Sequence, residues 1–331
     1  MAPAATPQTQ ETQDNDAFLK SMPLENVAPL WHILKDLSPP KPKPTSVPHL
    51  WNYKKLKPIL DESGRLVPTE LAERRVLMLV NPKLTGPRTT ETLYAGLQYI
   101  KPGEVAPAHR HVAFAFRFIL EGQGGFTNVE GTRMTMKRGD VLLTPRNCWH
   151  DHGKDGSGPM IWLDGLDLPI FQTIPVNYTN HYEEDRFPAV DNDNTPMKFP
   201  WQPVQDKLDS IKGDYAIFEY RDQENPEKFV SSILGAEALR ISPNASTPVR
   251  QENSSFVFCV YEGKGHTIVY GDDGEENVLN WENSDVFCIP CNMPFKHFND
   301  SSNEQAYLFN FSDTPLLKNL NIHSSDLEVK N

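Results

Sequence analysis

The chain contains an internal repeat. The segment PAHRHVAFAFRFILEGQG (107–124) aligns without a gap with PVRQENSSFVFCVYEGKG (248–265). Further on, RGDVLLTPRNCWHDH (138–152) aligns with NSDVFCIPCNMPFKH (283–297), now with a four-residue insertion in the second copy. Each copy reads as strand, glycine turn, strand, a strand that begins with Asp-Val, proline, and a last strand. One β-rich unit is therefore used twice along the chain.

The pattern around the repeat indicates the fold class. From about residue 90 onward, short alternating runs are separated by Gly, Pro, Asn and Asp, which is typical of an antiparallel sandwich or barrel. Two such units predict an all-β bicupin, that is, two tandem jelly-roll (double-stranded β-helix) barrels. A helical segment is expected before them, because PLENVAPLWHILKDL (23–37) and LWNYKKLKPILDESG (50–64) read as helices and ERRVLMLVNP (73–82) as a strand.

Composition changes along the chain predict the domain boundaries. The opening residues are polar and rich in Pro, Thr and Gln, which favours disorder. Proline-rich SPPKPKPTSVP (38–48) and the Pro, Asn and Asp clusters of 172–205 read as connections. The expected parts are a disordered tail (1–15), an N-terminal helical and linker segment (16–85), a metal-binding catalytic barrel (86–171), a linker (172–215), a degenerate second barrel without metal (216–318) and a C-terminal tail (319–331).

Charge and hydropathy exclude several function classes. The formal net charge of −12 argues against a nucleic-acid partner, since such binding needs clustered Lys and Arg. No run of 18 apolar residues and no signal-peptide pattern occurs, so we expect a cytoplasmic protein without a membrane partner. The pair Cys288 and Cys291 forms a single CxxC, which is too little for a zinc site.

The stretch from 107 to 118 predicts a functional strand face. Residues two apart share a face of a strand, so His109, His111 and Arg117 point the same way and the phenylalanines at 114, 116 and 118 point the other. Phenylalanines suit a packed outer layer, so the histidines and Arg117 are expected in the lumen. A buried guanidinium needs an anion, and no acid lies on that face of this strand. A carboxylate substrate would supply the charge and fit the guanidinium bidentately.

A third histidine completes a metal-binding pattern. The cupin motifs are met by Gly103-x5-His109-x-His111 and by Gly139-x5-Pro145-x4-His150. The glutamate usual a few residues after HxH is absent. Three neutral imidazoles on one side of an ion leave positions open opposite them, as a non-haem Fe(II) oxygenase needs. Imidazoles also suit zinc, copper and nickel, so this composition alone leaves the metal open.

Beyond these motifs, the chain resembles the gentisate 1,2-dioxygenases and the related salicylate and 1-hydroxy-2-naphthoate dioxygenases. The resemblance covers most of residues 28–170 and continues weakly through the second copy. The stretches that carry it are APLW (28–31), PHLWNY (48–53), AERRVLMLVNP (72–82), TLYAGLQYIKPGEVAPAHRH (92–111), FRFILEG (116–122), RGDVLLTP (138–145) and CWHDHG (148–153).

The resemblance implies a role for each matching residue. Fe(II) is expected on His109, His111 and His150. Arg117 and an arginine of the ERR pair, Arg74 on spacing in preference to Arg75, would hold the substrate carboxylate. His152 would contact a substrate oxygen or O2, with Asp164 as its outer partner. Tyr94, Gly96 and Gln98 share one strand face and would line the ring pocket, and substrate preference is expected to vary at positions 94 and 96.

The implied reaction is extradiol-type ring cleavage of gentisate by O2 to maleylpyruvate, in aromatic catabolism. The adjacent carboxylate and hydroxyl of gentisate would chelate the iron and leave a position for O2. Salicylate or 1-hydroxy-2-naphthoate is the alternative substrate, and a non-catalytic ligand-binding bicupin is the alternative class. The resemblance also suggests a homotetramer, or a dimer, with the N-terminal segment packing across subunits.

The second copy is expected to lack these features. In the overlay His109 falls on Arg250, His111 on Glu252 and His150 on Phe295, while Arg117 falls on Phe258. Of the lumen histidines only His152 keeps a counterpart, His297. We expect Arg250 to pair with Glu252 or a neighbour, and the two phenylalanines to fill the volume that substrate occupies in the first barrel.

Overall fold

The computed structural model describes residues 15–22, 26–271 and 274–325. The predicted disordered tail lies almost wholly outside the described residues, as does the end of the predicted C-terminal tail. The chain divides into two units, 1–43 and 44–331. Among the described residues, no helix is long and apolar enough to cross a membrane.

The described part of the first unit is helical, as the sequence predicts. Residues 15–21 form one helix, and α2 spans Leu30–Leu37. Helix α2 buries none of its residues, and its apolar side chains are exposed, among them Trp31 at 62% and Leu37 at 61%. Its apolar face therefore finds no cover within the described part of that unit.

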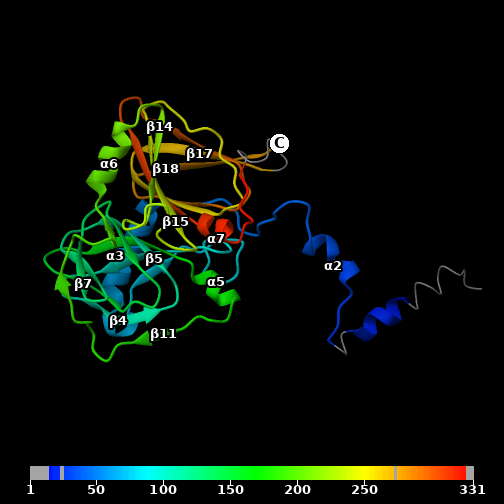
Figure 1. Ribbon diagram of the computed structural model, residues 1–331, viewed down its shortest axis with the longest axis horizontal. Coiled ribbons are helices and arrows are strands. Elements are labelled where there is room, and N and C mark those ends of the chain that lie inside the picture. The colour runs from blue at the N-terminus through cyan, green and yellow to red at the C-terminus, as the bar shows by residue number, and fades with distance from the viewer. Residues whose placement is uncertain (1–14, 23–25, 272–273, 326–331) are drawn as a thin grey trace, which may run out of the picture. The chain divides into compact units, whose positions relative to one another are not determined.

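The second unit, residues 44–331, contains two β-barrels, cyan to green and yellow to red in Figure 1. The first barrel consists of two six-stranded sheets. One sheet has the order β13 (Lys198–Phe199), β8 (Val141–Thr144), β5 (Ala115–Glu121), β10 (Met160–Leu166), β3 (Tyr94–Ile100), β2 (Val76–Met78). The other has the order β11 (Thr179–His181), β4 (Val105–His111), β9 (His150–Lys154), β6 (Gly125–Val129), β7 (Thr132–Met136), β12 (Val190–Asp191).

The second barrel has a six-stranded and a three-stranded sheet. The larger one has the order β1 (His49–Trp51), β19 (Val286–Ile289), β16 (Phe256–Glu262), β21 (Ala306–Ser312), β15 (Gly235–Ile241), β14 (Tyr215–Tyr220). The smaller one has the order β18 (Glu276–Glu282), β17 (Lys264–Tyr270), β20 (Phe295–Asn299). The remaining helices are α3 (Tyr53–Leu66), α4 (Thr69–Ala72), α5 (Leu168–Thr173), α6 (Trp201–Ser210) and α7 (Thr314–Asn319).

The predicted fold class, an all-β bicupin, is confirmed. The overlay of the two copies pairs the first residues of corresponding strands: Ala115 of β5 with Phe256 of β16, Val141 of β8 with Val286 of β19, and His150 of β9 with Phe295 of β20. Strands β10 and β21 each lead into a short helix, α5 or α7, whose N-cap is an aspartate. One β-unit has thus been used twice, with matching strand boundaries.

The predicted boundaries of the barrels need a correction. The segment 172–215, expected to be a linker, supplies edge strands of the first barrel: β11 pairs with β4, β12 with β7 and β13 with β8. The N-terminal segment likewise adds β1 to the second barrel and β2 to the first. These strands are two or three residues long and pair through their backbones at sheet edges, so they carry little of the alternation that marks a strand in sequence.

The phenylalanine face of β5 packs between the barrels. Phe116 and Phe118 are fully buried, and the ring of Phe118 stacks on Phe309 of β21 with centroids 4.5 Å apart. Phe116 also lies close to Phe311, at 6.2 Å. The layer that the sequence suggested to be the outside of the barrel is therefore its contact with the second barrel, and the opposite face of β5 is left for the lumen.

Candidate metal centre

Three histidines meet in the lumen of the first barrel. His109 and His111 lie at the end of β4, and His150 begins β9, which runs antiparallel to β4 with His109 and His150 in register. One ring nitrogen from each histidine lies within 4.8 Å of those from the other two. Within the described ranges, this is the single group of three or more His, Cys, Asp or Glu side chains close enough to hold a metal ion.

Backbone carbonyls fix the orientation of all three rings. Nδ1 of His109 lies 2.8 Å from the carbonyl of Pro107, and Nδ1 of His111 lies 2.9 Å from that of Ala113. Nδ1 of His150 makes the same kind of contact to Cys148, at 2.9 Å. A carbonyl can only accept, so each Nδ1 carries the proton and each Nε2 keeps its lone pair. The donor set therefore suits a metal ion.

Burial and charge keep these imidazoles neutral. Burial, reinforced by the charge of Arg74, lowers the pKa of His109 to about 2. Burial and the charge of Arg117 lower the pKa of His111 to about 4, and burial lowers that of His150 well below its usual range. Nε2 of His150 is buried without a hydrogen-bond partner among the described residues. A buried lone pair without a donor is costly, and a metal ion would satisfy it.

A cavity of about 440 Å³ opens beside the three histidines. Both sheets of the first barrel contribute to it, as does the segment between α4 and β2. Arg74 and Arg117 place two cations on its wall, which also carries Tyr94 and Gln98. The site residues predicted from the sequence thus lie around one cavity, apart from Gly96, which has no side chain to line it.

The two neighbouring arginines have different environments. Arg75 is buried and donates to both carboxylate oxygens of Glu104, at 2.8 and 3.0 Å. Burial raises the pKa of Glu104, but the hydrogen bonds and charge of Arg75 outweigh it and lower that pKa to about 2. Arg74 instead lines the cavity and donates from Nη1 to Nε2 of His109, at 2.7 Å. Of the pair, Arg74 is therefore the one that can meet a ligand.

The environment of Arg117 corrects one expectation. Its counter-charge was expected from substrate, but Asp164 on the neighbouring strand β10 is its register partner, with Nε and Oδ1 3.4 Å apart. Nη1 of Arg117 also donates to the hydroxyl of Thr144. Oδ1 of Asp164 also accepts from Nε1 of Trp162 at 3.0 Å, and the Trp162 ring lies 5.5 Å from that of His152. Burial raises the pKa of Asp164 to about 6, against the opposing charge of Arg117.

His152 is oriented by a threonine that sequence reasoning missed. Nδ1 of His152 lies 2.7 Å from Oγ1 of Thr127, and the Thr127 hydroxyl donates to the carbonyl of Asp151 at 3.3 Å. With its hydrogen used in this way, Oγ1 accepts from Nδ1–H of His152. Nε2 of His152 is then a hydrogen-bond acceptor. The alternation of β6 could have placed Thr127 in the lumen, but its register with β9 could not be predicted.

Position 96 is more crowded than the sequence suggested. A Cβ on Gly96 would lie 2.7 Å from Cγ1 of Val76 and 2.8 Å from the hydroxyl of Tyr94. The pairing of β3 with β10 is regular through Gly96, so this is no β-bulge. Gly96 thus provides space for Tyr94 and Val76, which both line the cavity, and Val76 is a wall residue that sequence reasoning did not identify.

The corresponding positions of the second barrel contain a different set of side chains. Arg250 pairs with Glu252 at 2.7 Å, as predicted, and also with Glu237 at 2.7 Å. Phe258 and Phe295 occupy the positions of Arg117 and His150. They do not fill the lumen as expected, because both line a cavity of about 380 Å³. The lumen of the second barrel is therefore hollow as well.

Fold and site together define a metal-binding bicupin, and comparison with known proteins refines that class. A cupin domain model matches residues 96–166. Gentisate 1,2 dioxygenase 1 of Aquipseudomonas alcaligenes is 34% identical, with 91% of this chain and 93% of the relative covered. The 5-aminosalicylate 1,2-dioxygenase of Comamonas sp is 30% identical, with 94% of this chain and 89% of the relative covered.

Solved structures agree with these relatives. The salicylate 1,2-dioxygenase of Pseudoaminobacter salicylatoxidans, in adducts with gentisate, superposes with a TM-score of 0.85 at 32% identity. The match covers 100% of this chain and 96% of that one. The chain belongs to the gentisate 1,2-dioxygenase family and is a ring-cleaving dioxygenase with a metal cofactor.

Proposed function

We propose that this dioxygenase is Fe(II)-dependent and converts gentisate and O2 to maleylpyruvate. The observation that carries the proposal is the cavity in which three neutral, Nε2-presenting histidines lie beside two arginines. Neutral nitrogen ligands on one side of an ion, with open positions opposite, suit non-haem iron in oxygenases. The relatives named for gentisate support the choice of substrate.

The protein contributes ligands and orientation, and the metal contributes the redox chemistry. His109, His111 and His150 would hold Fe(II), which when bound would pass electron density from the aromatic ring to O2. Their Nδ1–H bonds to backbone carbonyls hold the rings in place, so the ligand set is preorganised.

Two arginines would bind the substrate carboxylate. Arg74 lies on the cavity wall, and its bond to His109 would be exchanged for a bond to substrate when the metal takes Nε2 of that histidine. Arg117 is held by Asp164 and Thr144, which fix its direction without using all of its N–H groups. These cations explain how a chain of net charge −12 takes up an anion.

His152 would accept a hydrogen bond from the substrate hydroxyl. Its Nδ1 is bonded to Thr127, and burial lowers its pKa well below the usual range. A neutral imidazole with a free Nε2 lone pair can accept a hydrogen bond from the substrate hydroxyl. Asp164 acts through Arg117 as a positioning residue.

The activity test uses the full chain loaded anaerobically with Fe(II). Gentisate is added, then air, while absorbance of the ring-cleavage product and O2 consumption are followed. The proposal predicts that maleylpyruvate forms in the same amount as O2 disappears. A fully iron-loaded protein that consumes no O2 with gentisate contradicts it.

Two matched variants, Arg74→Ala and Arg75→Ala, test which arginine binds the substrate carboxylate. Arg74→Ala should raise KM for gentisate by about tenfold or more, because a charge-assisted hydrogen bond is lost. Arg75→Ala should lower thermal stability and leave KM within about twofold, because Arg75 pairs with Glu104. The reverse pattern would assign the carboxylate to Arg75.

A second candidate substrate is salicylate or a relative such as 5-aminosalicylate or 1-hydroxy-2-naphthoate. The relative from Comamonas and the solved salicylate dioxygenase favour this candidate. Both substrate types share the adjacent carboxylate and hydroxyl. Binding of the carboxylate by Arg74 and Arg117 therefore does not discriminate between them. The ratio of kcat/KM for gentisate to that for salicylate decides: a ratio above one supports gentisate.

We further propose a homotetramer or a dimer in which the N-terminal segment packs against another subunit. The exposed apolar side chains of α2 support this, since an uncovered face of that kind is typical of an interaction site. Light scattering on the full chain tests it. A monomer at micromolar concentration contradicts it.

A further inference from the structure

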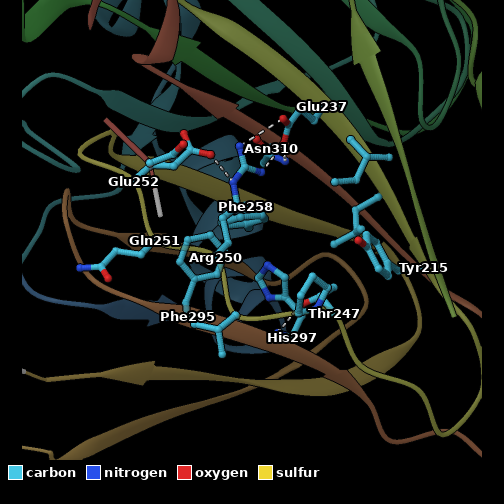
Figure 2. Close-up of a pocket in the computed structure, with 15 residues that line it drawn as sticks. Tyr215, Glu237, Thr247, Arg250, Gln251, Glu252, Phe258, Phe295, His297 and Asn310 are labelled. Atoms are coloured by element: carbon cyan, nitrogen blue, oxygen red, sulfur yellow. Dashed lines mark hydrogen bonds and ion pairs between the residues drawn. The ribbon is translucent and has the colours of Figure 1, made fainter. Parts of the chain in front are cut away.

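The second barrel contains a cavity that the dioxygenase reaction does not use. Its volume is about 380 Å³, within the range of small-molecule sites. It opens past Tyr215 and Ile217 of β14, which are 38% and 43% exposed, and ends at Phe258, Phe295 and His297. Figure 2 shows these residues around one space, with the Arg250 guanidinium on the side opposite Tyr215.

The charged residues of this cavity are paired with one another. Each nitrogen of the Arg250 guanidinium donates to a carboxylate: Nε to Glu252 at 2.7 Å, and Nη1 and Nη2 to Glu237 at 2.7 and 3.2 Å. Figure 2 marks these bonds with dashed lines. The second oxygen of Glu252 lies 3.2 Å from Nε2 of His323, and Asn310 donates to Glu237 at 3.2 Å. Each of these charged side chains is paired within the protein, and the two carboxylates outnumber the guanidinium, so an anionic ligand gains little here.

The remaining lining combines aromatic and aliphatic side chains with the polar side chains of Thr247, Gln251, Asn310 and Ser325, and His297 lies among the aromatic rings. The ring of His297 contacts Phe258 and Phe295, with centroids 4.7 and 5.2 Å apart. Its Nδ1 lies 2.7 Å from Oγ1 of Thr267, and Nε2 has no hydrogen bond to any residue that the structure describes. Burial lowers the pKa of His297 to about 3, so the ring is neutral. Its Nε2 can form one hydrogen bond with a ligand.

The two cavities therefore differ in the charge they present. The first carries Arg74 and Arg117 against Glu73 and Asp164, and a divalent ion would make it net positive. The second carries two carboxylates against one guanidinium. An anionic aromatic is attracted to the first cavity and disfavoured in the second.

We propose that the second barrel binds a small, uncharged aromatic alcohol of the phenol type, with its ring against Phe258 and Phe295 and its hydroxyl on His297. Aromatic faces at the closed end of the cavity supply apolar contact, and edge-to-face packing suits a single six-membered ring. The site is separate from the metal centre, so its occupation does not depend on the substrate proposed above.

Hydroquinone is a suitable probe, because it has the ring and hydroxyls of a phenol and no carboxylate. The iron-loaded full chain is titrated with hydroquinone anaerobically by calorimetry, and a soaked crystal locates the ligand. Ile217→Trp narrows the mouth from an exposed position and should weaken binding by at least about tenfold. Val249→Trp, on another part of the rim, should do the same if the first variant folds poorly.

Matched controls separate this site from the first cavity. Ile59→Trp adds the same ring at an exposed isoleucine of α3 and should leave hydroquinone affinity within about twofold. His297→Phe keeps an aromatic ring but removes the hydrogen bond, and should weaken hydroquinone by about tenfold. Benzoate, which has the ring and a negative charge, should bind the second barrel more weakly than hydroquinone.

Three results would overturn the proposal. One is hydroquinone density in the first cavity alone. Another is unchanged affinity in both Ile217→Trp and Val249→Trp. The third is benzoate in the second barrel with equal or higher affinity, because that would make Arg250 an anion site rather than a closed cluster.

Discussion

The two barrels are built from matching strands and have different lumens. In the first, β4 and β9 bring three histidines together, while in the second the same positions hold Arg250, Glu252 and Phe295. One pair is common to both. His152 bonds to Thr127 and His297 to Thr267, each at 2.7 Å and each between register partners. The repeat has thus kept its frame and one buried polar pair, and exchanged the residues that meet a ligand.

This difference bears on which buried polar groups find partners within the protein. Buried imidazole lone pairs without a metal are costly, as Nε2 of His150 illustrates. In the second barrel Arg250 satisfies Glu237 and Glu252 and the phenylalanines need no partner, while Oδ1 of Asn310 is buried without a hydrogen-bond partner among the described residues. The charged groups of the second lumen are therefore paired within the protein, whereas the first lumen presents a histidine triad that could hold an ion.

The largest effect should come from removing a ligand of the first barrel. His111→Ala should lower activity by more than about 100-fold, since even outer partners of metal ligands are worth 10 to 100-fold. The matched change in the second barrel, Glu252→Ala, should leave metal content and kcat within about twofold. Steady-state rates and metal analysis on both variants check this. Loss of metal in Glu252→Ala would contradict the division of roles.

The second effect concerns stability in the second barrel. Arg250→Met should lower the free energy of unfolding by about 2–3 kcal/mol, because two partly buried carboxylates lose their cation. Chemical denaturation measures the loss. The triple variant Arg250→Met, Glu237→Gln, Glu252→Gln should recover part of this loss. Failure to recover any would show that the unpaired charges are not its cause.

Arg117→Lys should act on substrate binding with little effect on the metal. Lysine is a point charge and does not reproduce the planar fork that Asp164 and Thr144 hold in place. KM for gentisate should rise by about tenfold, while bound iron stays constant. An unchanged KM would remove Arg117 from the substrate clamp.

The smallest effect is expected at position 96. A methyl group on Gly96 would press on Val76 and on the hydroxyl of Tyr94, so the cavity wall should shift. Gly96→Ala should change the ratio of kcat/KM between gentisate and salicylate by about fivefold, in the range of a single methyl in a pocket. Adding Val76→Ala should restore the ratio. Equal changes for both substrates would make the effect one of stability only.

Much of the first site could be predicted because strand periodicity is local. The spacing of His109, His111 and Arg117 places them on one face whatever the rest of the chain does. The ion pair of Arg117 with Asp164 could not be predicted, since it depends on the register between β5 and β10. That Arg75 is buried in an ion pair while Arg74 lines the cavity likewise could not be predicted, because it depends on Glu104 of a different segment.

In the fold, too, local features could be predicted and features that depend on long-range packing could not. The matching strands of the two barrels could be predicted from the repeat, whereas β11, β12 and β13 could not, because edge strands of two or three residues pair through backbone alone. Substitutions in the second copy revealed which ligands were lost. They did not reveal that Phe258 and Phe295 line a cavity, because the volume left in a lumen depends on how all its walls pack.

The most direct test of the difference between the barrels is the metal content of the full chain after loading with Fe(II) and removal of excess ion. The account predicts about one ion per chain, none in a His109→Ala, His150→Ala double variant, and about one in Arg250→Met. A content near two, or an ion that survives loss of His109 and His150, would contradict it.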